Sequence, residues 1–185
     1  LAGAALGIAQ HFYMGARLLP LILAIVLLHQ FLLKPTRIIR LRWHIVTLGI
    51  AFLLGIGPLL SHFLQAPSTF NARLELVGIF QSEWFAHQQA AGKSNMEILA
   101  DQARGAFGAY TFVPDRSAQY DPGIAVLDPY SAVLFVFGIA LVIMHWRQAG
   151  SALILAWLVG TAIFGGMLLA SAPASARYVT PTPMA

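Results

Sequence analysis

Two arginines are the side chains of this sequence best suited to bind an anion. Arg17 closes the run from Gln10 to Arg17, and Arg177 lies between Pro173 and Tyr178. A guanidinium group is permanently charged and can donate two parallel hydrogen bonds to one phosphate. Position alone favours another role for Arg17, in which its charged end extends to lipid headgroups. The sequence leaves open whether the two arginines converge on one phosphate.

Three aspartates form a second group of candidates, at positions 115, 121 and 128. A carboxylate can act as a general base or as a metal ligand. Asp128 precedes Pro129 and a long apolar run, which predicts a helix N-cap instead. Asp121 precedes Pro122, a pair typical of turns. Asp115 fits neither role and is the better candidate for ligand contact.

The histidines do not form a metal signature, because no two of them have the i,i+4 spacing of zinc-binding helices. Most stand at the ends of apolar runs, where a structural role is expected. His11 is the exception, because it adjoins Tyr13 and Arg17. The chain has no cysteine, which excludes disulfides, thiol nucleophiles and cysteine-based metal sites.

The composition indicates which elements position these side chains. Of the 185 residues, 58% are hydrophobic and 10% are charged, whereas a soluble domain carries about 25% charged residues. This excludes a disordered segment and a typical cytosolic enzyme, and it predicts an integral membrane protein. Since a helix needs about 20 apolar residues to cross a bilayer, we expect spans at Leu18–Leu33, Leu41–Phe63, Pro129–Trp146 and Ser151–Leu169.

The basic residues predict the orientation of these spans. Lys34, Arg37, Arg40 and Arg42 lie in one short connection without an acid, and Arg147 lies in the other. Lys and Arg accumulate in cytoplasmic loops, so both connections are predicted to be cytoplasmic. The sequence pI of about 9.9 then reflects topology, and nucleic acid is not an expected partner.

The segment 64–128 is therefore predicted to be an extracytoplasmic loop containing two amphipathic helices. In the first, Leu74, Val77, Phe80 and Trp84 recur at helical spacing. The second begins with a capping box at Ser94-x-x-Glu97. Its expected apolar face consists of Met96, Leu99, Ala103 and Phe107. Such helices could cover a cavity at the membrane surface or pack on each other.

The predicted fold is thus all-α, a polytopic helical bundle in a membrane. Residues 1–63 form transmembrane helices, the first of them truncated, with the basic connection at 34–44. Two further transmembrane helices occupy 129–171, and 172–185 forms an outer corner and the start of another helix. We expect the chain to be an internal piece of a longer protein.

Three stretches resemble the GT-C glycosyltransferases, and most closely the dolichyl-phosphate-mannose–protein mannosyltransferase-like group that includes the aminoarabinose transferases. The first runs from Leu1-Ala-Gly-Ala-Ala-Leu-Gly-Ile into Tyr13-Met-Gly-Ala-Arg17-Leu-Leu-Pro20. The second is Phe112-Val-Pro-Asp115-Arg-Ser-Ala-Gln-Tyr120 followed by Leu127-Asp128-Pro129, and the third is Ser171-Ala-Pro173-Ala-Ser-Ala-Arg177-Tyr178.

The resemblance implies a multi-pass enzyme of the bacterial plasma membrane. It would transfer a sugar from a polyprenyl-phosphate donor to a lipid, glycan or protein acceptor, in cell-surface glycan synthesis or protein glycosylation. Arg17 and Arg177 would contact the donor phosphate, and the cavity would be lined by His11, Tyr13, Asp115, Tyr120 and Tyr178.

The same resemblance assigns no catalytic residue here, because the family's acidic base lies in a loop upstream of Leu1. Metal use varies within the family, so a divalent cation stays open as a cofactor, and no metal ligand is assigned. A portion of a transporter or flippase is the alternative, and a purely structural membrane subunit is a third. Transporters place ionisable residues or broken helices near the bilayer midplane, whereas the span interiors here hold almost no ionisable residues and the charges gather at the outer face.

Overall fold

The computed structural model describes residues 1–12, 14–114 and 123–170, and the described parts are helical apart from turns and one isolated bridge. The chain divides into two compact units. The first unit comprises Leu1–Ala72 and Arg147–Ala156, and the second comprises Arg73–Trp146 and Trp157–Ala185.

Three helices in the described parts are long and apolar enough to cross a membrane: Gly15–Leu33, Arg42–Gln65 and Ala149–Met167. The first of these helices consists of the end of the 3-10 turn η1 (Met14–Arg17) followed by α2 (Leu18–Leu33). The second is α4 (Arg42–Gln65). The third joins α9 (Ala149–Gly160) to the π-helical segment η2 (Thr161–Met167). No residue of α4 is buried, and an apolar helix left so exposed is typical of contact with lipid.

The last of these helices agrees with the span expected over Ser151–Leu169. Its backbone changes from α to π at Thr161. The predicted span Pro129–Trp146 is shorter, because α8 covers Pro129–Met144, 16 residues. At 1.5 Å per residue this helix is about 24 Å long, less than the roughly 30 Å hydrocarbon core of a bilayer.

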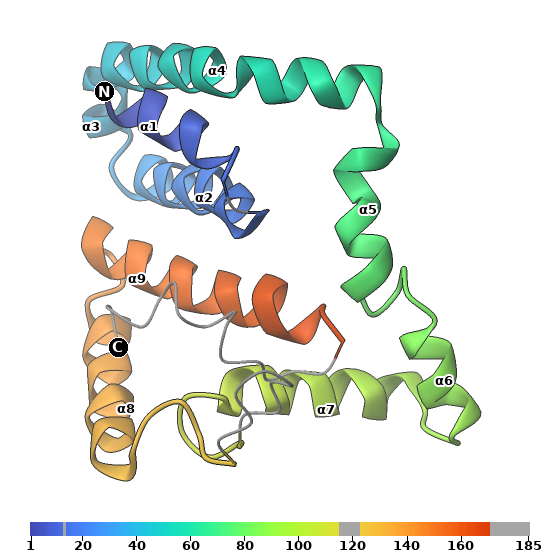
Figure 1. The fold of residues 1–185 in the computed structure, drawn as a ribbon. Helices are drawn as coiled ribbons and strands as arrows, with labels where there is room; N and C mark the ends of the chain where they lie inside the picture. The colour runs from blue at the N-terminus through green and yellow to red at the C-terminus, as the bar shows by residue number, and fades with distance from the viewer. Residues whose placement is uncertain (13, 115–122, 171–185) are drawn as a thin grey trace. The chain divides into compact units, whose positions relative to one another are not determined.

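In the first unit, the short helix α1 (Ala2–Ala9) packs on α4 with the two backbones in contact (Figure 1). Gly3 and Gly7 are buried there. A Cβ atom on Gly7 would lie 2.5 Å from the carbonyl oxygen of Phe52. A Cβ atom on Gly55 would lie 2.8 Å from the carbonyl oxygen of Ala4. The Gly3-x-x-x-Gly7 pair therefore acts as a close helix-packing surface, as small residues do in membrane bundles.

The same unit holds both predicted basic connections. The first is α3 (Pro35–Arg40), which begins with proline at its first helical position and joins α2 to α4. The second contains Arg147, whose carbonyl oxygen accepts a hydrogen bond of 3.3 Å from Nε2 of Gln30. Because Gln30 is only 5% exposed and lies near the end of α2, this bond brings the two connections to the same end of the unit.

The second unit is organised around α7 (Asn95–Gly108), which packs against η2. Gln102 of α7 is 4% exposed and donates a hydrogen bond of 2.9 Å from Nε2 to the carbonyl oxygen of Leu169. Two backbone hydrogen bonds add to this contact, from Ile79 to Leu168 and from Ala170 to Val77. The chain around Val77–Ile79 is thereby tied to the residues after η2.

This backbone pairing overturns the first predicted amphipathic helix. Instead of one helix through positions 74–84, α5 (Ser68–Val77) ends where the pairing begins, and α6 (Trp84–Ala90) starts after a turn. The reason is that Gly78 bridges Leu169, so the backbone on either side of Gly78 bonds to this distant strand-like segment.

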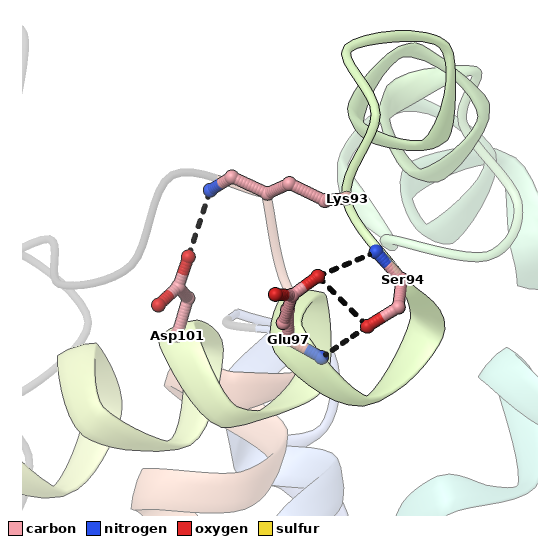
Figure 2. Close-up of polar contacts among 4 residues, drawn as sticks. All are labelled: Lys93, Ser94, Glu97 and Asp101. Carbon is pink, nitrogen blue, oxygen red and sulfur yellow. Dashed lines mark hydrogen bonds and ion pairs between the residues drawn. The ribbon is translucent and has the colours of Figure 1, made fainter.

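The second predicted helix begins where expected but buries a different face. Ser94 caps α7, and its capping box with Glu97 is formed (Figure 2). Met96 and Phe107, expected on the apolar face, are 76% and 50% exposed. The buried positions lie on an adjacent face that packs on η2, namely Ile98, Gln102, Gly105, Ala106 and Gly108.

Candidate functional site

Arg17 lies at the junction of η1 and α2 and reaches a distant part of the first unit. Its Nη1 donates a hydrogen bond of 3.0 Å to the carbonyl oxygen of Phe70, 53 residues later in the chain. Phe70 belongs to the first turn of α5. The start of the span Gly15–Leu33 is thereby joined to the segment that follows the span Arg42–Gln65.

Two aromatic rings frame the Arg17 guanidinium. Its central carbon lies 5.0 Å from the ring centroid of Phe63 and 4.8 Å from that of Phe70. The two rings are themselves in edge contact, with centroids 5.1 Å apart and planes at 83°. A cation over an aromatic face gains about 0.5–2 kcal/mol, depending on its desolvation. We call Arg17, Phe63 and Phe70 the Arg17 corner.

The other edge of the guanidinium is not used by the described residues. Nε of Arg17 is buried and has no hydrogen-bond partner among them. A buried donor left without a partner costs about 1–3 kcal/mol. Nε and Nη2 share an edge that can bind one oxyanion through two parallel hydrogen bonds. The Arg17 corner therefore offers the charge and the hydrogen-bond donors that an anion site needs. Because Nε is buried, the groups that cover it must move before an anion can reach it.

Two neighbours of Arg17 tie α1 to the rest of the first unit. Gln10 is 5% exposed, and its Nε2 donates to the carbonyl oxygens of Leu6 and Ala16 at 3.0 Å and 2.9 Å. Nε2 of the exposed His11 lies 3.0 Å from the carbonyl oxygen of Gly55. When Nε2 carries the proton of a neutral imidazole, Nδ1 is left as an acceptor. His11 therefore keeps one nitrogen for a ligand while the other holds α4.

The remaining predicted site residues cannot be placed beside Arg17. They lie outside the described residues, and their convergence with Arg17 stays a prediction. These residues are Tyr13, Asp115, Tyr120, Arg177 and Tyr178.

Asp128 is the N-cap of α8, as the sequence predicted. Its Oδ1 accepts hydrogen bonds from the backbone N–H groups of Tyr130 and Ser131, at 3.0 Å and 3.1 Å. Ser131 also donates from its hydroxyl to Oδ2 at 2.5 Å. The hydroxyl and backbone bonds of Ser131, with that of Tyr130, lower the pKa of Asp128 below its ordinary value. A carboxylate held in this way starts a helix and is a weaker base than usual.

The polar groups at the start of α7 also satisfy one another. The backbone N–H and the hydroxyl of Ser94 both donate to Oε2 of Glu97 at 2.8 Å (Figure 2). These bonds, the backbone one first, lower the pKa of Glu97. Lys93 pairs with Asp101 at 2.7 Å (Figure 2). This cluster stabilises the helix start and leaves Arg17 as the stronger candidate for ligand binding.

The second unit has an apolar groove of its own. It is open, has a volume of about 740 Å³, and lies between the segments 111–114 and 123–128 and the first turns of α8. Its polar residues are Thr111 and Asp128, and the rest of its lining is apolar, including Phe112, Ile124, Val133 and Phe137. Such a groove suits an aliphatic chain, and the sequence offered no pattern that marked it.

Within the described residues, no group of three or more histidine, aspartate or glutamate side chains could hold a metal ion. No protein-family model, curated protein or solved structure matches this chain. The geometry of the Arg17 corner is therefore the main structural support for a function.

Proposed function

We propose that this chain is part of a glycosyltransferase of the bacterial plasma membrane. The enzyme transfers a sugar from a polyprenyl-phosphate donor to a lipid, glycan or protein acceptor at the extracytoplasmic face. The observation that carries the proposal is the unpartnered buried Nε of Arg17 at one end of a candidate membrane span. The resemblance of the Tyr13–Pro20 and Ser171–Tyr178 stretches to GT-C enzymes adds support.

In this proposal, Arg17 binds the donor phosphate through its Nε–Nη2 edge. When the bond between the anomeric carbon and the phosphate oxygen breaks, negative charge develops on the leaving phosphate, and a fixed cation stabilises that charge. Phe63 and Phe70 orient the guanidinium, and the Phe70 carbonyl holds Nη1 away from the ligand edge. Arg177 is proposed as a second phosphate contact, and no catalytic base is assigned.

Because Nε is buried, the α4–α5 junction must move before a phosphate can reach this atom. That junction contains Ala66 and Pro67, between the end of α4 and the start of α5. The proposed cavity residues are those predicted from the sequence, and His11, with its free Nδ1, is the one of them that the structure describes.

The test compares Arg17→Ala and Arg17→Lys in the full-length protein with Arg104→Ala, which removes an exposed arginine of α7. Polyprenyl phosphate is the binding probe, and sugar transfer from a polyprenyl-phosphate donor is the activity. Since hydrogen bonds to charged groups contribute about 1.5–3 kcal/mol, we expect Arg17→Ala to weaken binding about 10- to 100-fold. Arg17→Lys should be only partly active, and Arg104→Ala unaffected. Unchanged binding and transfer in both Arg17 variants would refute the assignment.

A transporter or flippase portion is a second candidate, and one observation favours it. The span Ala149–Met167 changes to a π-helix at Thr161, a residue that is 4% exposed, and π-helical turns inside α-helices are frequent at functional sites. Vesicles containing the full-length protein would show translocation of a fluorescent lipid-linked sugar without turnover if this candidate is correct. Sugar transfer without translocation would favour the glycosyltransferase.

A further inference from the structure

The end of α2 farther from Arg17 carries a concentration of positive charge. Lys34, Arg37, Arg40 and Arg42 follow one another within the segment 34–42, and all four side chains are exposed. We call these four residues the basic end of the first unit. Since α2 has 16 residues, it separates the basic end from Arg17 by about 24 Å, so the two cationic sites are distinct.

The first unit contains no carboxylate side chain that could neutralise these cations. The first acidic residue of the sequence is Glu75, and the segment Arg147–Ala156 has none. The ion pairs among the described residues, Glu83 with His87 and Lys93 with Asp101, belong to the second unit. A counter-anion for the basic end must therefore come from outside the first unit.

The local helix geometry brings two of the cations close together. Arg37 and Arg40 both lie in the last turn of α3, and residues three apart are neighbours on a helix surface, where like charges repel. The negative end of the helix dipole offsets part of this repulsion. The same effect at the end of α2 reaches Lys34, the C-cap of that helix. Arg42 is the first residue of α4, at a positive helix end, and needs other anions to balance its charge.

Apolar side chains lie among the cations. Ile39 and Trp43 are 53% and 68% exposed, and the guanidinium of Arg42 lies 5.7 Å from the Trp43 ring centroid. Tryptophan concentrates where hydrocarbon meets headgroups, and long basic side chains reach from that depth to the phosphates. A soluble phosphate would satisfy the charges alone, whereas a lipid satisfies both the charges and the apolar groups.

We propose that the basic end is a binding site for the headgroups of anionic phospholipids in the bilayer that α2 and α4 span. The guanidinium and ammonium groups pair with lipid phosphates, while Ile39 and Trp43 insert among the upper acyl carbons. This site requires α2 and α4 to be membrane spans, and it is independent of sugar transfer. It fixes the depth of the α2–α4 connection and gives the protein a preference among lipids.

The test uses Trp43 as the reporter in the full-length protein, with Trp84, Trp146 and Trp157 changed to Phe and any tryptophans outside this segment replaced likewise. The protein is placed in symmetric vesicles of phosphatidylcholine and phosphatidylglycerol, one of which carries bromines near the headgroup. Symmetric leaflets make the result independent of orientation. A juxtamembrane cation adds about 1 kcal/mol of attraction to an anionic surface, which is roughly fivefold in affinity. We therefore expect brominated phosphatidylglycerol to be preferred at Trp43 by roughly fivefold or more.

Two variants test whether the four basic-end residues cause the preference for phosphatidylglycerol. Changing all four basic-end residues to Gln should bring the ratio close to one, whereas Arg37→Lys, Arg40→Lys and Arg42→Lys together should keep most of it. Arg104→Gln, in the second unit, is the matched control and should change nothing. Far-UV circular dichroism checks that each variant is folded.

The proposal is overturned if the unmodified basic end shows no preference, or if the Gln variant keeps it. Salt separates the lipid from a soluble anion. Sodium chloride and sodium phosphate at equal ionic strength should weaken the preference equally, because screening is the common cause. A loss specific to phosphate would show a soluble-phosphate site in place of the lipid site.

Discussion

Arg17 contacts Phe70 in two ways at once, through the face of its ring at 4.8 Å and through its carbonyl oxygen at 3.0 Å. The ring contact uses the charge of the guanidinium, and the hydrogen bond uses one N–H group. Together they fix both the position and the rotation of the group. The binding of a ligand to the opposite edge of Arg17 would depend on the position of α5. The reason is that a shift of Phe70, which belongs to α5, would rotate the Arg17 guanidinium.

Removing the aromatic frame should destabilise the first unit. We expect Phe63→Leu combined with Phe70→Leu to lower the free energy of unfolding by about 1–2 kcal/mol, because two cation–π contacts and a ring–ring contact are lost. Thermal unfolding in detergent measures the effect. Phe31→Leu, an exposed phenylalanine of α2, should have little effect, and an equal loss in this control would contradict the role given to the frame.

The glycine contact between α1 and α4 predicts a sharp difference between neighbouring positions. Gly7→Ala places a Cβ 2.5 Å from the Phe52 carbonyl oxygen and 2.9 Å from Gly55, so the helices must separate, at a cost of about 1–3 kcal/mol. Gly57→Ala meets nothing within 4 Å and should be neutral or slightly stabilising. Denaturation in mixed micelles compares the two, and equal stabilities would refute the close packing of α1 on α4.

Gln102 is expected to hold α7 to the chain after η2. Gln102→Leu keeps a similar volume but leaves the Leu169 carbonyl without its 2.9 Å donor, which should cost about 1–3 kcal/mol. Gln81→Leu, at an exposed position, is the matched control. Amide hydrogen exchange of α7 should become faster in Gln102→Leu alone, and unchanged protection would mean that the bond contributes nothing.

The capping box of α7 predicts a pH dependence. Because its hydrogen bonds to Ser94 hold the pKa of Glu97 below the ordinary 4.5, its ionised form stabilises the folded helix. That contribution is complete above the pKa of an unfolded glutamate and is lost as the pH falls through the lower folded value. A fall in the protection factor of the Ser94 amide at acidic pH, with each measured rate compared to the intrinsic exchange rate at the same pH, checks this.

Glu97→Gln can keep the side-chain acceptor but removes the titrating charge, so the acidic loss of protection attributable to this residue should disappear. If Glu97→Gln shows the same pH dependence as the parent protein, another group is responsible.

The features that the sequence predicted correctly depend on residues close together in the chain. Asp128 and the Ser94–Glu97 pair act on backbone groups within three residues, so local propensity is enough to identify them. The apolar runs behind Gly15–Leu33, Arg42–Gln65 and Ala149–Met167 were visible for the same reason.

The features that the sequence did not predict depend on distant partners. The bonds from Arg17 to Phe70 and from Gln102 to Leu169 join residues 53 and 67 positions apart. The helix expected through Phe80 was interrupted because Ile79 bonds to Leu168. Neither the long-range bonds nor the break in the helix can be predicted from neighbouring residues. The apolar residues in 74–84 recur at helical spacing whether or not the backbone there bonds to a distant segment. The same limitation applies to the predicted convergence of Arg17 and Arg177.

The discontinuity of the first unit also has a consequence for biosynthesis. Gln30 is translated before Arg147, and the carbonyl of Arg147 that accepts its hydrogen bond emerges from the ribosome 117 residues later. Until then, a buried amide near the end of a candidate span lacks this acceptor. The unit is therefore completed only after the segment between its two parts has been made, and a nascent chain stopped before Arg147 would be a better substrate for membrane chaperones and quality-control proteases.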